Sequence, residues 1–400
     1  MEGDPREHVI ETRRDLFDFL DSQMQSAYRS LRGLKRLESE TTLIKSYIFE
    51  VDVPKRMDAG YSVLKEKAEF VEHIFSLTDG QPSHTVVTEK GEEGFFEVRL
   101  PGHPTKHQRS DAILYLDTAT DERFWLAYSV SNANTLNWWL ASVLQARTEF
   151  DFVWLWPKFL ETIQQRGEPR GFGLHYDFRK FEEGSDEKTT YLKMQLWGGR
   201  ETDDLYRTLR TDDRFRDKTV LSKVRLKEWG ENPREDAFAL QDIKYTGKFT
   251  SRGTDFSTHL GTLSHVRSEY KKAILSIEES YALKWREGEA GGVVLEGYAI
   301  NFFPSGFSLP VDTLSKVLLN GRGPFRLMGF VTRVSDSFVV AEVVDLHSGG
   351  EFSMEICPDF LTIYLPEYSC GNTVARLYTN LQHYFSMQFT VEADNGDQLF

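Results

Sequence analysis

The first forty residues carry apolar side chains at a seven-residue spacing, which is typical of one long helix with a narrow apolar seam. No proline interrupts the segment from Arg6 to Glu38. At 1.5 Å per residue such a helix is about 50 Å long, more than one small domain needs. We therefore predict that it binds a protein partner or a second copy of the chain, the alternative being packing within its own domain. The predicted contact residues are Ile10, Phe17, Leu20, Met24 and Leu31.

Beyond this helix the pattern changes to short apolar or alternating runs, which are typical of strands. The run from Thr42 to Val53 places Tyr47, Phe49 and Val51 on one face. Three further runs between residues 94 and 130 are separated by turn residues, which predicts a meander of antiparallel strands. The whole chain is predicted to be α+β, with mixed, largely antiparallel sheets, a long N-terminal helix and a smaller C-terminal α+β domain.

Changes in composition along the chain predict four parts. These are a helix at 1–40, an α+β domain at 41–180, a basic α+β region at 181–286 and an acidic α+β domain at 293–400. The segment from Arg286 to Gly292 is charged and then rich in glycine, which is typical of a hinge. We therefore expect a domain boundary there.

The composition is that of a globular protein: of 400 residues, 40% are hydrophobic and 28% are charged. The only cysteines, Cys357 and Cys370, cannot form a disulfide framework, and two thiols cannot fill a four-ligand zinc site. No run of about 18 apolar residues and no secretory signal is visible. These features predict a cytoplasmic protein without a membrane segment.

The net charge of −14 disfavours binding to nucleic acid by the chain as a whole, but the charge is unevenly distributed. Residues 200–272 contain 16 basic and 13 acidic side chains, whereas residues 286–400 contain 6 and 14. Within the basic region, alternating cations on a predicted strand share one face, as a row of phosphate contacts would require. The predicted nucleic-acid-binding residues are Lys223, Arg225, Lys227, Lys244, Lys248 and Arg252.

Asp242 and Lys244 have the acid-x-Lys arrangement of metal-dependent nucleases, in which the acid holds Mg²⁺ and the lysine orients the attacking water. Such a centre also needs an upstream acid, for which Asp217, Glu228, Glu231 and Asp236 are within range. A solvated strand end explains the same residues. Mg²⁺ is expected only if this alternative holds, and no other cofactor or metal is predicted.

A second candidate for chemistry is the pair Asp345 and His347, which leaves a predicted strand into a Ser-Gly-Gly turn. Two residues apart on an extended chain, these side chains share one face and could act as acid and base. A hairpin turn with exposed polar groups is the alternative. The glycine and nucleophile motifs of phosphate-loop enzymes, serine hydrolases, zinc proteases and kinases are absent from the sequence.

Taken together, the patterns favour a non-catalytic subunit of a cytosolic assembly that binds nucleic acid through its central basic region. The alternatives are a metal-dependent nuclease using Asp242 and Lys244, and an acid/base enzyme centred on Asp345 and His347. The sequence leaves the ligand, the partner and the presence of any active site open.

Overall fold

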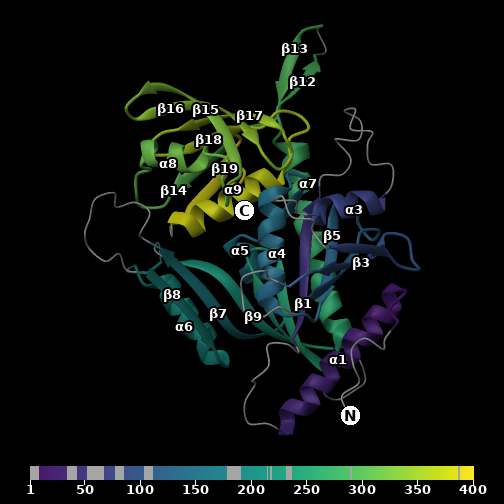
Figure 1. The fold of residues 1–400 in the computed structure, drawn as a ribbon. Coiled ribbons are helices and arrows are strands. Elements are labelled where there is room, and N and C mark those ends of the chain that lie inside the picture. The colour runs from purple at the N-terminus through teal and green to yellow at the C-terminus, as the bar shows by residue number, and fades with distance from the viewer. Residues whose placement is uncertain are drawn as a thin grey trace. The chain divides into compact units, whose positions relative to one another are not determined.

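A computed structural model gives the fold as α+β with largely antiparallel sheets, which confirms the predicted class (Figure 1). The structure describes residues 9–33, 43–51, 67–76, 85–102, 111–177, 191–213, 215–216, 219–230, 237–288, 291–385 and 388–400. No helix in these ranges is both long and apolar enough to cross a membrane.

Two compact units divide the chain, and each is built from several segments. The first unit comprises residues 1–152, 226–243 and 247–267, and the second comprises 153–225, 244–246 and 268–400. The expected hinge at 286–292 coincides with the connection of a hairpin, in which the N–H of Gly288 donates to the carbonyl of Gly292 at 2.6 Å. Its strands are β12 (Lys284–Glu287) and β13 (Val293–Glu296), and both belong to the second unit.

The sheet of the first unit contains the predicted meander, extended by strands from distant parts of the sequence. Its order is β2-β3-β4-β5-β1-β11-β10, with β6 also paired to β1. The bounds are β1 (Ile44–Val51), β2 (Val86–Glu89), β3 (Phe95–Leu100), β4 (Ala112–Asp117), β5 (Phe124–Ser129), β6 (Phe150–Phe152), β10 (Phe238–Lys244) and β11 (Lys248–Gly253).

Strand β1 is buried along its whole length, although its sequence alternates as a half-exposed strand does. Its neighbours β5, β6 and β11 make it a central strand. One face packs into the apolar cluster of the first unit through Phe49, and Ser46 on the other face contacts His259. Even Lys45 and Glu50 are about 1% exposed. The Glu50 carboxylate is compensated by Arg123, whose Nη2 lies 2.6 Å from Oε1.

One large apolar cluster fills the first unit. Helices α3 (Lys67–Phe75) and α4 (Ala133–Ala146) pack on the sheet and contribute residues such as Ile74, Phe75, Leu136 and Trp139. The N-cap of α4 is Asn132, whose side chain accepts from the N–H groups of residues 134 and 135. Residues 52–66, which precede α3, lie outside the described ranges.

Helix α1 spans Arg13–Gly33, and its apolar seam packs within the first unit. Ile10, Leu20 and Met24 are buried, and the ring of Phe17 lies 5.6 Å from that of Phe256. Asp21 Oδ1 accepts the N–H of Phe256, the first residue of α7 (Phe256–Ser280), at 3.0 Å. The helix backbone is described at Leu31, but the side chain there is outside the description.

The second unit begins with α5 (Pro157–Gln164) and a smaller group of strands covered by helices. Strand β7 (Glu168–Asp177) pairs with β8 (Tyr191–Trp197), and β9 (Val220–Trp229) contributes its first six residues to this unit. Helices α6 (Arg200–Thr211) and α9 (Asn372–Phe385) both pack against β7. Phe172 of β7 faces Tyr206 of α6, whereas His175 faces His383 of α9, so the two helices lie on opposite faces of the strand.

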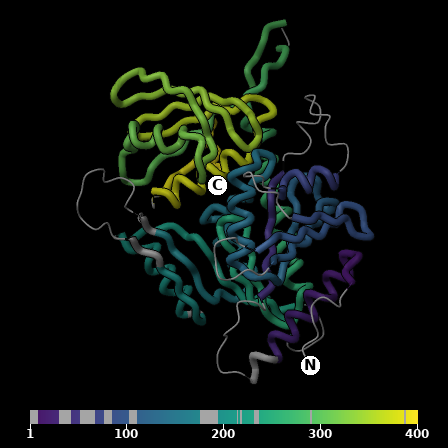
Figure 2. The backbone as a smooth tube through the Cα atoms, in the orientation of Figure 1, coloured from purple at the N-terminus to yellow at the C-terminus, as the bar shows by residue number. Residues whose placement is uncertain are grey.

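A six-stranded antiparallel sheet completes the second unit, in the order β15-β16-β17-β18-β14-β19. Figure 2 follows its path in green and yellow from the β12–β13 hairpin to the C-terminus. The C-terminal residue also packs, since Phe400 stacks on Tyr378 with ring centroids 4.7 Å apart. The bounds are β14 (Ile300–Pro304), α8 (Val311–Leu318), β15 (Leu327–Ser335), β16 (Phe338–Asp345), β17 (Glu351–Ile356), β18 (Leu361–Tyr364) and β19 (Phe389–Ala393).

Candidate nucleic-acid interface

The cations of β9 alternate with buried apolar residues along the strand. Val224 and Leu226 are fully buried, whereas Lys223, Arg225 and Lys227 are half-buried on the other face. This is the pleat that the sequence pattern predicts, with side chains pointing to opposite faces at successive positions. The first two cations belong to the second unit, and Lys227 belongs to the first.

In the second unit, Lys223 and Arg225 both lie over the ring of Trp197. The Lys223 Nζ is 4.5 Å and the Arg225 Cζ is 3.9 Å from the ring centroid. Gly171 on the paired strand makes room for this ring, because a Cβ at Gly171 would come within 2.4 Å of the Trp197 Cε3 atom. The glycine thus allows the indole to lie close to the sheet, where its ring attracts both cations.

In the first unit, Lys227 is held in the same manner by two aromatic rings. Its Nζ lies 3.5 Å from the centroid of Trp229 and 4.3 Å from that of Phe238. Tyr28 of α1 packs edge-on against Phe238 at 5.3 Å. Trp229 is 53% exposed, which is unusual for the largest apolar side chain and leaves ring surface open to a ligand.

Cations beside aromatic rings on a sheet surface can perform two tasks in binding a nucleic acid. Lysine and arginine contact phosphates without reading sequence. Exposed indole and guanidinium planes stack on unpaired bases, whatever the base. Each of these two groups of β9 residues therefore has the chemistry of a contact for single-stranded nucleic acid, with little capacity to distinguish one sequence from another.

The other predicted cations differ in accessibility. Lys248 is buried, its Nζ donates to Asn137 Oδ1 at 2.6 Å, and it lies 5.5 Å from the ring centroid of Tyr47. Its ammonium thus serves the packing of the first unit, which removes it from the predicted phosphate-binding set. Lys244 and Arg252 are half-buried on β10 and β11.

Asp242 and Lys244 alternate with buried neighbours on β10, so they lie on the half-buried face of the strand. Within the described ranges, Asp242 belongs to no group of three or more side chains that could hold a metal ion. Of the upstream acids named above, Asp217, Glu231 and Asp236 lie outside those ranges. Glu228 accepts a hydrogen bond from Gln241, a residue of the opposite face of β10.

A buried hydrogen-bonded chain in the first unit escaped the sequence reasoning. Gln241 Nε2 donates to Glu228 Oε2 at 2.9 Å, so its Oε1 faces His259 Nδ1, 2.7 Å away. Since that oxygen only accepts, Nδ1 carries the proton, and Nε2 accepts from the Ser46 hydroxyl at 2.9 Å. Thr262 also donates to the Glu228 carboxylate.

This chain has the order of a serine nucleophile and its base, but its surroundings fit a structural role. Ser46, Gln241 and His259 are completely buried, so a substrate cannot reach the Ser46 oxygen. Burial lowers the pKa of His259 to about 3, which keeps the imidazole neutral at physiological pH. The sequence signal was a histidine at an apolar position of the helix, between Phe256 and Leu263.

Asp345 and His347 are also buried, whereas the sequence led us to expect either a functional pair or an exposed turn. Asp345 forms an ion pair with Arg376 and accepts from the Thr373 hydroxyl and, at 2.9 Å, from the N–H of His347. The Arg376 charge and these hydrogen bonds outweigh desolvation and lower the pKa of Asp345. The carboxylate therefore holds α9 to the end of β16 rather than exchanging protons.

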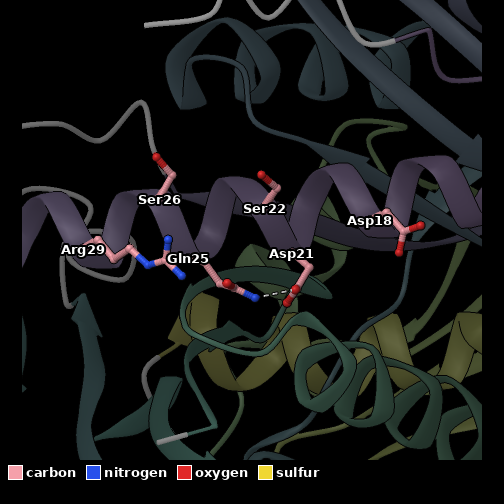
Figure 3. Close-up of a pocket in the computed structure, with 6 residues that line it drawn as sticks. All are labelled: Asp18, Asp21, Ser22, Gln25, Ser26 and Arg29. Carbon is pink, nitrogen blue, oxygen red and sulfur yellow. Dashed lines mark hydrogen bonds between the residues drawn. The ribbon is translucent and has the colours of Figure 1, made fainter. Parts of the chain in front are cut away.

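A shallow polar hollow of about 340 Å³ lies along α1 (Figure 3). One helix supplies its lining, and Asp21 there is engaged by Gln25 Nε2 at 2.6 Å and by the N–H of Phe256. The first bond lies within α1 and the second joins α1 to α7, so Asp21 has a structural role. Its lining residues are Asp18, Asp21, Ser22, Gln25, Ser26 and Arg29.

Sequence comparison places nearly the whole chain in one family. A family model described as "MJECL33-like protein" matches residues 5–400, so the chain belongs to the MJECL33-like family. A relative from Methanocaldococcus jannaschii, named "Uncharacterized protein MJECL33", is 23% identical over 425 residues. The match covers 96% of this chain and 95% of the relative, so the similarity extends over nearly the whole of both chains.

Proposed function

We propose that this protein is a non-catalytic subunit of a cytosolic assembly that binds single-stranded nucleic acid through β9. The observation that carries the proposal is the row of Lys223, Arg225 and Lys227 at alternate positions, each beside an indole ring. Single strands are favoured over duplexes because the same surface offers planes for stacking as well as cations for phosphates.

The absence of a reactive geometry at the other candidates supports a binding role over catalysis. Asp345 is sequestered by Arg376, and the serine of the buried chain cannot meet a substrate. The nuclease alternative would require a metal at Asp242, which joins no three-ligand group among the described residues. A binding surface needs none of these.

The assembly part of the proposal is supported by exposed apolar side chains on the β12–β13 hairpin. Trp285 and Val293 are 69% and 72% exposed, and the register of the hairpin places Leu295 opposite Trp285. A two-stranded hairpin gains little stability alone, so an apolar face on one is suited to a protein contact. The contact through α1 stays a prediction; its buried residues would become available only if the helix left the first unit.

The salt dependence of binding tests the proposal directly. Three phosphate contacts on a single strand predict a slope of log affinity against log salt of about −2, and about −2.7 on duplex DNA. The probe is a fluorescent single-stranded oligonucleotide of ~20 nucleotides, as DNA and as RNA, measured by anisotropy from about 50 to about 200 mM salt. Replacing Lys223, Arg225 and Lys227 together by alanine should flatten the slope by about that amount.

A matched variant separates local contacts from total charge. Lys272, Lys316 and Arg322 are exposed, and replacing all three by alanine removes the same three charges from other places. We expect this variant to keep the slope of the original chain. An equal slope for the β9 variant and the original chain would contradict the proposal.

A further inference from the structure

His383 of α9 is a buried histidine whose ring nitrogens have no hydrogen-bond partner among the described residues. The residue is 6% exposed, and both Nδ1 and Nε2 are inaccessible and unbonded. A neutral imidazole has one donor and one acceptor, and leaving either unpaired in the core destabilises the folded state. Such a group needs an explanation in a folded protein, and a bound ion is one.

A second histidine lies beside it within the same unit. His175 of β7 is half-buried, and its ring centroid is 6.0 Å from that of His383, with the planes at 74°. On the other side, the ring of Tyr245 packs on His383 at 3.9 Å and 31°, which fixes the orientation of the imidazole. His383 is therefore the buried and oriented ring of the pair, and His175 is the partly exposed one.

The spacing of the rings suits two imidazoles on one metal ion. With a metal–nitrogen distance of about 2.0–2.1 Å, the ring centroids are roughly 5.2 Å apart at a tetrahedral angle and roughly 6.4 Å apart in line. The observed 6.0 Å lies between these limits. Imidazole nitrogen is a preferred ligand of Zn²⁺, Ni²⁺ and Cu²⁺ and a poor one for Mg²⁺ or Ca²⁺.

We propose that His175 and His383 form a two-histidine site for a divalent transition-metal ion of the zinc type. Among the described residues, no third histidine, cysteine or carboxylate joins this pair, so water fills the other positions from the open side of His175. Two protein ligands make the site weaker than a structural zinc site. It is an exchangeable site and does not depend on the nucleic-acid proposal.

The protonation state of His383 agrees with this role. Burial and the neighbouring His175 hold the pKa of His383 well below its ordinary value, so its ring is neutral at physiological pH. A metal ligand must be unprotonated, and a neutral imidazole meets this condition without releasing a proton. His175 faces His383 from β7 and Tyr245 faces it from the segment after β10; neither brings a carboxylate.

Titration of the metal-free full-length chain with Zn²⁺ by calorimetry tests the site. We expect one ion per chain at this site, and His175→Gln should weaken its binding by at least about 10-fold, since even indirect partners of metal ligands contribute that much. His175 is half-buried, so this variant should keep its fold. His73→Gln, which removes a half-buried histidine of the first unit, is the matched control and should bind as the original chain does.

A second measurement avoids any variant that fails to fold. Co²⁺ added to the unmodified chain should broaden the imidazole NMR signals of His175 and His383 before those of His73. Zn²⁺ binding that is equal in the His175→Gln and His73→Gln variants would overturn the proposal. So would Co²⁺ broadening that spares His383.

Discussion

Arg376 and Arg225 carry the same guanidinium group within the second unit, and their surroundings give the two groups opposite roles. Arg376 is completely buried, forms an ion pair with Asp345 and donates Nε to the carbonyl of Phe325 at 2.9 Å. Arg225 is half-buried over the indole of Trp197. The buried Arg376 is paired with Asp345 and stabilises the fold. The half-buried Arg225 lies beside an indole ring and can also bind a ligand.

The buried histidines His259 and His383 also differ in their surroundings. His259 is satisfied at both nitrogens by Ser46 and Gln241, whereas His383 has neither nitrogen satisfied in the described part of the chain. Both are buried, so exposure alone does not separate a structural histidine from a ligand. The hydrogen bonds made by the two ring nitrogens do separate them.

The largest expected effect comes from breaking the buried ion pair. Asp345→Asn should destabilise the protein by about 3–5 kcal/mol, because it leaves the Arg376 charge buried without its counter-ion. Urea denaturation followed by circular dichroism measures the change. Asp312→Asn is the matched control: it removes the partner of Arg333 from an exposed pair, and the expected cost is about 0–1 kcal/mol. Equal losses in the two variants would contradict the structural role of Asp345.

The pH dependence of stability should distinguish the buried histidine from the buried carboxylate. The folded pKa of His259 is about 3 and the unfolded value is near 6.5, so the unfolded chain binds the extra proton between these values. Stability should therefore fall by about 1.4 kcal/mol per pH unit for this group as the pH drops below about 6.5. His383, whose pKa is also lowered, should add to the same slope.

Asp345 should act in a lower pH range. Its folded pKa lies below the ordinary value, so its contribution is complete above about pH 4 and is lost as the carboxylate becomes protonated below that. Unfolding free energies measured at several pH values test both statements. His259→Gln should lower the number of protons taken up on unfolding above pH 4 by about one, and so reduce the slope of the unfolding free energy against pH. A slope unchanged by this variant would show that His259 is protonated in the folded chain.

A smaller effect should follow from removing the exposed indole at the end of β9. Trp229→Leu should weaken binding of a single-stranded oligonucleotide by about 1–3 kcal/mol, the contribution of one stacked base, and should leave the salt slope unchanged. Anisotropy titrations measure both quantities. Trp285→Leu removes an indole that is 69% exposed elsewhere and should leave the affinity unaltered. The same loss in both variants would mean that general surface apolarity, rather than stacking at β9, governs binding.

The smallest effect is expected at Asp242. We expect no Mg²⁺- or Mn²⁺-dependent cleavage of DNA or RNA by the protein, and Asp242→Asn should therefore change nothing. Gel assays with labelled substrates measure cleavage. A metal-dependent cleavage that this substitution abolishes would establish the nuclease alternative instead.

Local patterns were sufficient to predict several strands and the turns between them. The alternation of Lys223, Val224 and Arg225 predicted the two faces of β9, and the punctuation between residues 94 and 130 predicted the meander. For β1 the same reasoning predicted one apolar face, but the strand is buried on both. A pattern reports the backbone conformation, and the depth of a strand depends on neighbours that come from elsewhere in the chain.

The sequence by itself determined the α+β class, most of the helices and strands, and the cationic face of β9. The tertiary structure decided which polar groups are buried and what they meet: Asp345 with Arg376, Ser46 with His259, and His175 with His383. The first kind of information is local, because side-chain direction repeats every two or 3.6 residues. The second depends on contacts between residues far apart along the chain, 213 positions in the case of Ser46 and His259, and no local pattern specifies them.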